Sequence, residues 1–193
     1  MVHRFDGRML AFLAVVVLAA WLVHAMASAI DTQPTTSPVV KQKGEGEMGP
    51  QKKAEALGIK FEKLKPGYLN WCSKSGKTLY TSGFSSKIKG TLGKNLSVEE
   101  GAKAARECAV DVLRAVWDRH GTLDGLRVVK VLGCVNATPD FTEHPKVVNG
   151  ASDLLHAIFG KETDGHHARS ALGFSSLPFG AAVEVEAIFE IKE

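Results

Sequence analysis

The segment "VEVEAIFEI" at residues 183–191 alternates between two kinds of side chain, and this pattern most narrows the possible folds. Apolar side chains occupy one set of alternate positions: Val183, Val185, Ala187, Phe189 and Ile191. The other set holds three glutamates and an isoleucine: Glu184, Glu186, Ile188 and Glu190. Alternate residues of a strand point to opposite faces of the sheet. The pattern therefore predicts a strand with one face in the core and the other toward solvent or a partner subunit.

Two amphipathic helices are predicted to cover the apolar face of this sheet. The segment 97–121 begins with a capping box, in which Ser97 is followed by Glu100, repeats apolar residues at helical spacing and ends at Gly121. The segment 145–160 begins with a proline, carries a second apolar stripe and ends at a glycine. Two such helices can cover only one face of one sheet, which gives a two-layer sandwich and leaves the other face bare.

The remaining strands follow from short apolar or β-branched runs. Residues 68–84 predict a β-hairpin around the turn Lys-Ser-Gly-Lys at 74–77. Residues 126–136 are almost continuously apolar, which is typical of a central strand buried on both faces. Residues 171–174 and 183–191 are predicted to be paired strands. The expected fold is α+β, with one mixed sheet and two helices on one face, in the order β-β-α-β-α-β-β.

The N-terminal 29 residues are predicted to be a targeting segment. Arg4 and Arg8 flank the apolar run 9–23, and Ala-Ser-Ala follows at 27–29. This order describes a secretory signal peptide, and the run also approaches the length of a membrane anchor. We therefore expect the secretory pathway or a membrane. A mitochondrial presequence is a further alternative, which the uniform apolarity disfavours.

The composition of the remaining residues separates a linker from a folded domain. Residues 30–52 are rich in Pro, Thr, Gly, Lys and Gln, so a disordered linker is expected there. Residues 53–193 are expected to form one domain, which begins with a short helix ended by Gly58. The net charge is +3, and lysines and glutamates are interspersed, so no nucleic-acid partner is expected.

The cysteines and histidines indicate no metal site. Cys72, Cys108 and Cys134 are widely spaced, which is typical of neither a disulfide framework nor a zinc site. His166 and His167 are adjacent at a loop end, where histidines are usually exposed. No metal ligand is therefore predicted.

Several ordered motifs resemble a known family. The segment "ARSALGFSSLPFGAAVEVEAIFEI" is similar to the C-terminal signature of the YjgF/Rid family, also called endoribonuclease L-PSP: an Arg-Ser pair, a Leu-Pro and a final strand of the form V/I-E-V/I-E-A-I. Five further stretches resemble its chorismate-mutase-like subgroup in the right order: "AEALGIKF", "TSG", "LSVEEGAKAARECA", "VNATPDFTEHPKVVNGASDLL" and "HARSALG". The resemblance covers residues 53–193.

The resemblance implies a fold, an assembly and an activity. The family's fold is the two-layer sandwich predicted above, and its members form homotrimers with ligand clefts between subunits. The best-defined members are imine deaminases, which hydrolyse 2-iminobutanoate and 2-iminopropanoate to 2-oxo acids and ammonia without a metal or cofactor. Other members are described as ribonucleases or translation inhibitors.

The resemblance also assigns roles to five residues. Glu184 matches the catalytic glutamate that positions the attacking water, and Arg169 matches the carboxylate-binding arginine. Asn149, Ser82 and Tyr68 match substrate-binding residues of the cleft. The residue types suit the chemistry, because a guanidinium grips a carboxylate bidentately and a carboxylate can accept a proton from water. We expect Arg169 and Glu184 on adjacent strands, within reach of one 2-imino or 2-oxo acid.

Two departures keep other functions open. Ala171 replaces a cysteine of the deaminases, and Phe84 replaces a glutamine. They favour a non-catalytic trimeric module that binds a small ligand or docks on a larger assembly, in which Glu184 would serve as an interface pair. A ribonuclease is a further alternative, against which stands the lack of a basic-aromatic stripe or a suitably placed histidine pair. Glu186 and Glu190 are assigned to solvent or to inter-subunit ion pairs.

Overall fold

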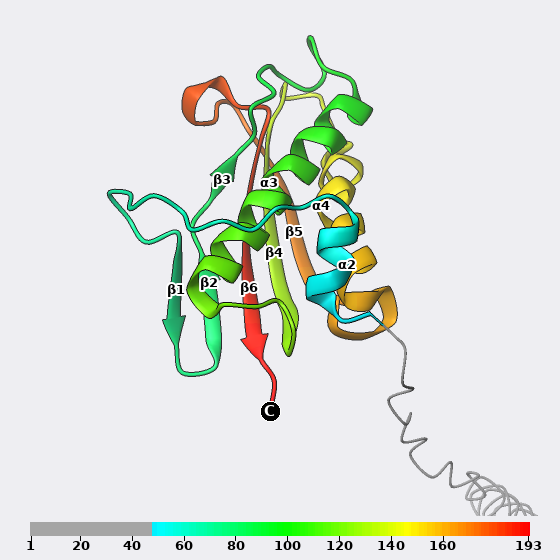
Figure 1. Ribbon diagram of the computed structural model, residues 1–193. Helices are drawn as coiled ribbons and strands as arrows, with labels where there is room; N and C mark the ends of the chain where they lie inside the picture. The colour runs from blue at the N-terminus through cyan, green and yellow to red at the C-terminus, as the bar shows by residue number, and fades with distance from the viewer. Residues whose placement is uncertain (1–47) are drawn as a thin grey trace, which may run out of the picture. The chain divides into compact units, whose positions relative to one another are not determined.

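One six-stranded sheet with helices on one face forms the part of the chain that this computed structural model describes, residues 48–193 (Figure 1). In chain order the elements are α2 (Pro50–Ala56), β1 (Cys72–Ser75), β2 (Thr78–Thr81), β3 (Phe84–Ser85), α3 (Val98–His120), β4 (Leu126–Asn136), α4 (His144–Phe159), the π-helical turn η1 (Gly160–Asp164), β5 (Ala168–Phe174), the 3-10 turn η2 (Pro178–Gly180) and β6 (Val183–Ile191). The predicted α+β fold class and element order are confirmed, and the short helix predicted before Gly58 is present as α2, whereas β3 and the two short turns are additions.

The sheet runs in the order β1-β2-β6-β4-β5. Strand β6 lies in the middle, where one edge pairs with β4 and the other pairs with β2 and then with β3. All of these pairings are antiparallel except that of β4 with β5, which is parallel. The sheet is therefore mixed, as predicted.

The two C-terminal strands are not partners, and the prediction that they pair is wrong. Strand β4 lies between β5 and β6 and pairs with both. The reason is the crossover helix α4: a strand–helix–strand connection returns the chain parallel to the strand it left. Strand β5 therefore takes the free edge of β4, and β6 must pair with the opposite edge.

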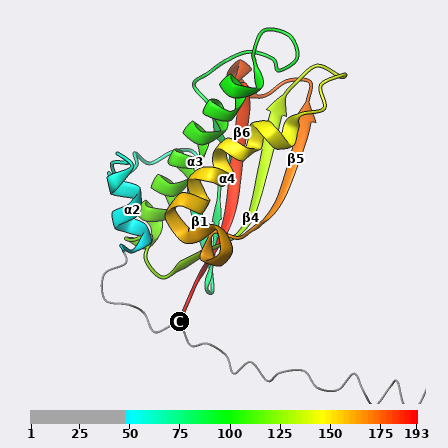
Figure 2. The ribbon, with the colours of Figure 1, turned by 90° about the vertical axis from the view of Figure 1, so that its right-hand side faces the viewer.

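Helices α3 and α4 cover the same face of the sheet, as Figure 2 shows. The capping box predicted for α3 is present, because Ser97 Oγ accepts from the Glu100 amide at 3.2 Å and Glu100 Oε2 accepts from the Ser97 amide at 2.8 Å. The helix ends at Gly121, whose φ of 92° favours glycine. The two helix backbones meet at Gly150, where a Cβ atom would lie only 1.9 Å from the carbonyl oxygen of Ala102.

The apolar side of β6 lies in the core beneath these helices. Four of its five predicted core residues are at most 2% exposed: Val183, Val185, Ala187 and Phe189. The ring of Phe189 lies 6.0 Å from that of Phe159 on α4, measured between centroids. Burial of a side chain this large contributes about 1.5–3 kcal/mol, so this strand face anchors the sheet to the helical layer.

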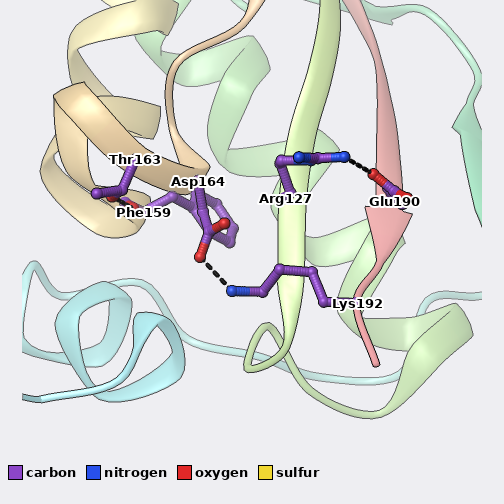
Figure 3. A network of polar contacts seen from close by, with 6 residues as sticks. All are labelled: Arg127, Phe159, Thr163, Asp164, Glu190 and Lys192. Carbon is purple, nitrogen blue, oxygen red and sulfur yellow. Dashed lines mark hydrogen bonds and ion pairs between the residues drawn. The ribbon is translucent and has the colours of Figure 1, made fainter. Parts of the chain in front are cut away.

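Strand β4 is central but is not buried on both faces, so that part of its prediction is wrong. Its side chains alternate between buried and more exposed positions, and Val129 is 40% exposed. Only one face of the sheet has a helical cover, and β4 places polar side chains on the other. Arg127 forms an ion pair with Glu190 of β6 (Figure 3), and Lys130 Nζ donates to Ser170 Oγ of β5 at 2.8 Å.

The folded unit begins before residue 53. Helix α2 includes residues 50–52, which were predicted to belong to the linker. Gln51 holds this helix in place through two hydrogen bonds of 3.1 Å. Its side-chain oxygen accepts from the Leu123 backbone amide, and its own backbone amide donates to Asp124 Oδ1. The targeting segment and the linker up to residue 47 lie outside the described residues. Within residues 48–193, no helix combines the length and apolarity needed to cross a membrane.

Candidate functional site

Arg169 lies on the edge strand β5, and its guanidinium reaches over the first half of helix α4. Its Nη1 donates to Asn149 Oδ1 at 2.9 Å and to Ser152 Oγ at 3.0 Å, and its Nη2 donates to the Pro145 carbonyl at 3.3 Å. The structure therefore brings together two of the five predicted site residues, Arg169 and Asn149. Ser152, which sequence reasoning missed, lies one helical turn beyond Asn149, and that i,i+3 spacing is the signal that could have found it.

The charge of Arg169 has no counter-ion among the residues that the structure describes. Three hydrogen bonds use at most three of the five N–H donors of a guanidinium, so at least two donors have no protein acceptor within residues 48–193. All three acceptors are neutral and come from one helix. The group is thus held in place and partly buried but not neutralised, which suits it to bind an anion.

His167 joins this group from the segment before β5. Its Nε2 lies 3.0 Å from Ser152 Oγ, its Nδ1 lies 2.5 Å from the Gly165 carbonyl oxygen, and its ring centroid lies 5.2 Å from that of His156. Burial lowers the pKa of His167, as do the nearby charges of His156, Arg169 and His166, against the opposing effect of the Gly165 hydrogen bond. The prediction that both adjacent histidines are exposed is right for His166 and wrong for His167.

Glu184 belongs to a second group, on the open face of the sheet. Its Oε2 accepts a hydrogen bond from Ser85 Oγ of β3 at 2.6 Å. Its carboxylate also lies against Gly83, where a Cβ atom would come within 2.4 Å of Oε1. Residue 83 must therefore be glycine for the carboxylate to lie here. Cys134 of β4 is the strand partner of Glu184; burial raises the pKa of its thiol, and the charges of Glu184 and Glu186 add to the effect.

Ser82 directly precedes Gly83, and Tyr68 belongs to the loop before β1. Ser82 Oγ donates to the Asn70 carbonyl at 2.7 Å, so its hydroxyl ties β2 to the loop that precedes β1. Tyr68, in the same loop, is fully exposed. Phe84, one of the two departures, packs its ring 5.8 Å from that of Trp71. Phe84 is opposite the buried Val185 and packs against the core, so this aromatic pair lies on the helix-covered face of the sheet, whereas Glu184 lies on the open face.

A single copy of the chain does not bring Arg169 and Glu184 together. Arg169 is opposite Val131 of β4, whereas Glu184 is opposite Cys134 on the other side of that strand. Two strand spacings of about 4.8 Å and three residues of about 3.3 Å put their Cα atoms roughly 14 Å apart. Val131 is buried under the helices, and Cys134 belongs to the open face. The two side chains therefore point to opposite faces, and the expectation that they lie on adjacent strands is wrong.

Three hollows of the described chain lie away from both groups. One hollow of about 600 Å³ lies at the end of the sheet, lined by Lys94, Phe141, His144 and Phe174 among others. Two more, of about 480 and 560 Å³, lie beside the loop before β1 and beside α2. Neither Arg169 nor Glu184 lines any of the three. In one copy, Arg169 and Glu184 therefore lie apart from each other and outside these three hollows.

Comparison with known proteins places the chain among a defined set of relatives. The model of the family described as endoribonuclease L-PSP matches residues 65–191. Protein TCP17 of Trypanosoma cruzi is 44% identical over 146 residues, which cover 71% of this chain and 91% of the relative.

Two crystal structures are similar over nearly their whole length. The protein Atu1372 of Agrobacterium tumefaciens, whose function is unknown, has a TM-score of 0.66 and 35% identity, with 74% of this chain and 94% of its own covered. A proposed endoribonuclease from Shewanella oneidensis has a TM-score of 0.67 and 27% identity, with 74% and 99% covered. In both cases the match covers the sheet and its helical layer.

Proposed function

The chain belongs to the endoribonuclease L-PSP family, also called YjgF/Rid, and we propose that it binds a small 2-oxo or 2-imino acid through Arg169 and hydrolyses the imine without a cofactor. The observation that carries this proposal is the state of Arg169. Its guanidinium is partly buried, oriented by three neutral acceptors of α4 and without an acidic partner among residues 48–193. A carboxylate ligand would supply the missing charge and accept from the donors that remain.

The chemistry that follows needs one water molecule and one base. Water adds to the imine carbon, and a carboxylate such as Glu184 takes its proton as the C–O bond forms. That proton passes to the imine nitrogen, which gives a carbinolamine. The proton of its hydroxyl then moves to the nitrogen as the C–N bond breaks and the C=O bond forms, which leaves a 2-oxo acid and ammonia. A positioned base contributes about 10²–10⁴-fold to such a step. The hydrogen bond from Ser85 fixes Oε2 of Glu184 and leaves Oε1 for water.

We propose that a homotrimer completes the site, because Arg169 and Glu184 lie on opposite faces of the sheet in one copy. The open face of the sheet supports this assembly. It has no helical cover within the described chain and carries apolar side chains that water would otherwise contact, among them Val129 at 40% and Leu172 at 49% exposure. Light scattering of the full chain should give three times its mass of 20.7 kDa. A monomeric mass would exclude a shared cleft.

The test of ligand binding is calorimetry with 2-oxobutanoate. Loss of a charge-assisted pair costs about 2–5 kcal/mol, so Arg169→Ala should weaken binding about 30- to 5,000-fold. Arg169→Lys should restore little, because lysine lacks the planar fork. Arg106→Lys, on the exposed side of α3, is the matched control and should bind as the wild type does. Unchanged binding by Arg169→Ala would show that this arginine is structural.

The test of catalysis couples the full chain to a pyridoxal-phosphate-dependent threonine dehydratase and follows the formation of 2-oxobutanoate. We expect the wild type to accelerate it. Glu184→Gln should keep ligand binding but abolish the acceleration. Glu186→Gln, two residues along the same face and exposed, is the control that should retain it.

A non-catalytic binding module is the second candidate, and one observation favours it. Glu184 is already engaged by Ser85 and lies on the face opposite Arg169, so an interface role would also explain its position. Binding of 2-oxobutanoate that depends on Arg169, without any acceleration of imine hydrolysis, would establish this second function in place of the first.

A further inference from the structure

The hydrogen bonds around His167 fix which of its ring nitrogens carries a proton. Nδ1 lies 2.5 Å from the carbonyl oxygen of Gly165, and a carbonyl oxygen can only accept. Nδ1 therefore holds the proton in the neutral ring, and Nε2 is left as an acceptor. The hydroxyl of Ser152, 3.0 Å from Nε2, must then donate to it.

The direction of the hydrogen bond between Ser152 and His167 also determines how Ser152 interacts with Arg169. A serine hydroxyl has one proton to donate and two lone pairs to accept with. Because that proton goes to His167, the oxygen is free to accept from Nη1 of Arg169, as the distance of 3.0 Å indicates. The donors are thus ordered in one direction, from Arg169 to Ser152 to His167 to the Gly165 carbonyl.

Burial makes this chain of hydrogen bonds difficult to replace by water. Ser152 is only 5% exposed and His167 is partly buried, so without its histidine acceptor the proton of the serine hydroxyl would lose this hydrogen bond in a site with little access to water. The charged and titratable groups that face His167 are Arg169 from β5, His156 from α4 and His166 beside it in the chain, and each disfavours a charged imidazole. The hydrogen bonds from Arg169 to Gly165 require a neutral His167 ring, and this environment favours the neutral form.

We propose that His167 and Ser152 are positioning residues, which hold the Arg169 guanidinium in the orientation that binds a carboxylate. The identity of the ligand rests on the function proposed above, whereas the orientation of the hydrogen bonds does not. Asn149 and the Pro145 carbonyl contact the same guanidinium from the preceding turns of α4. Ser152 is the residue that links the guanidinium to the imidazole. Neither positioning residue needs to touch the ligand.

Two substitutions of His167 separate positioning from packing. Glutamine places its amide near the position of Nε2 and can accept from Ser152, whereas asparagine places its amide near Nδ1 and cannot reach Ser152. We expect His167→Gln to bind 2-oxobutanoate within about threefold of the wild type, and His167→Asn and Ser152→Ala to bind about tenfold more weakly. His120→Gln, at the end of α3, is the control and should bind normally. Equal effects of the two His167 substitutions, or no effect of either, would refute the proposal.

A measurement on the unmodified protein covers the case in which a variant does not fold. Long-range nitrogen–proton correlation spectra of the ¹⁵N-labelled full chain should show His167 as the Nδ1–H tautomer at pH 7.5, and an Nε2–H tautomer would overturn the proposal. Arg169→Ala, measured in parallel, separates the two proposals. If it binds 2-oxobutanoate normally, the proposed function fails. If it loses binding while Ser152→Ala and both His167 variants keep it, only the positioning role fails.

Discussion

Gly150 is the point at which helices α3 and α4 come closest, and replacing it tests their packing. We expect Gly150→Ala to destabilise the protein. The new Cβ atom would lie 1.9 Å from the carbonyl oxygen of Ala102 and 2.6 Å from its carbonyl carbon. Since both atoms belong to the backbone of α3, no side-chain rotation can relieve the overlap. The two helices would have to separate.

The size of the effect follows from that overlap. A carbon–oxygen contact needs about 3.3 Å, so α4 would move from α3 by about 1.4 Å from the 1.9 Å position. A gap of this size removes much of the dispersion energy between the side chains along the helix contact. Overpacking costs about 1–3 kcal/mol, and alanine returns about 0.5–1 kcal/mol relative to glycine inside a helix. Because the clash is with backbone, the upper end applies, and we expect a net loss of about 2 kcal/mol.

Gly101→Ala is the matched control, since it makes the same chemical change inside α3. Its Cβ atom would meet Leu92 Cδ1 at 2.9 Å and Val147 Cγ1 at 3.1 Å, which are the ends of side chains. These methyl groups can move by a few tenths of an ångström, so the overlap costs less and the helix preference of alanine offsets part of it. We expect the stability of this variant to stay within about 1 kcal/mol of the wild type.

Urea unfolding followed by circular dichroism measures both variants. The midpoint concentration should fall for Gly150→Ala with an unchanged slope, because the area exposed on unfolding is the same. If Gly150→Ala were as stable as Gly101→Ala, the backbones of α3 and α4 would not be in contact at this point, and the account of their packing would be wrong.

Two further predictions concern stability. Ser97→Ala removes the capping box of α3 and should cost about 1 kcal/mol in the same urea titration; an unchanged midpoint would mean that the box is replaced by water at no cost. Burial lowers the pKa values of His156 and His167 below 6.5 in the folded protein. As the pH decreases, these histidines are therefore protonated in the unfolded chain before they are protonated in the folded one, which favours unfolding. The melting temperature should therefore be steady above pH 6.5 and fall as the pH decreases below it, and His167→Gln should reduce that fall, whereas an equal fall in the variant would contradict the assignment.

The elements that the sequence predicts well are those whose signals are local. The bounds of α3 follow from Ser97, Glu100 and Gly121, which lie within a few residues of the backbone groups they satisfy or shape. The alternation of residues 183–191 likewise places its own side chains on two faces. Strand neighbours are not local: nothing within β5 or β6 records that β4 lies between them, because this depends on the direction of the α4 crossover.

In the candidate site, too, some contacts could be predicted from the sequence and others depend on the fold. The pairing of Arg169 with Asn149 agrees with the family resemblance, since both positions match its motifs. His167 was assigned to an exposed loop end because adjacent histidines usually lie there. The Gly165 carbonyl lies two residues before it in the chain, whereas Ser152 comes from the middle of α4, and only the fold brings that hydroxyl to Nε2. The separation of Glu184 from Arg169 is equally a property of strand order.

The central position of β6 has a consequence for how the protein is made. Strand β6 leaves the ribosome after every other strand of the sheet, yet it is the one that joins β2 and β3 to β4. Until it is synthesised, β1 can pair only with β2 and β4 only with β5, while β3 has no strand partner, and contacts such as Ala187 with Thr81 span 106 residues of sequence. Sheets built on such distant pairings fold slowly. Helix α3, whose contacts with the sheet are mainly with β6, must therefore wait with part of its apolar face uncovered until this strand completes the surface beneath it.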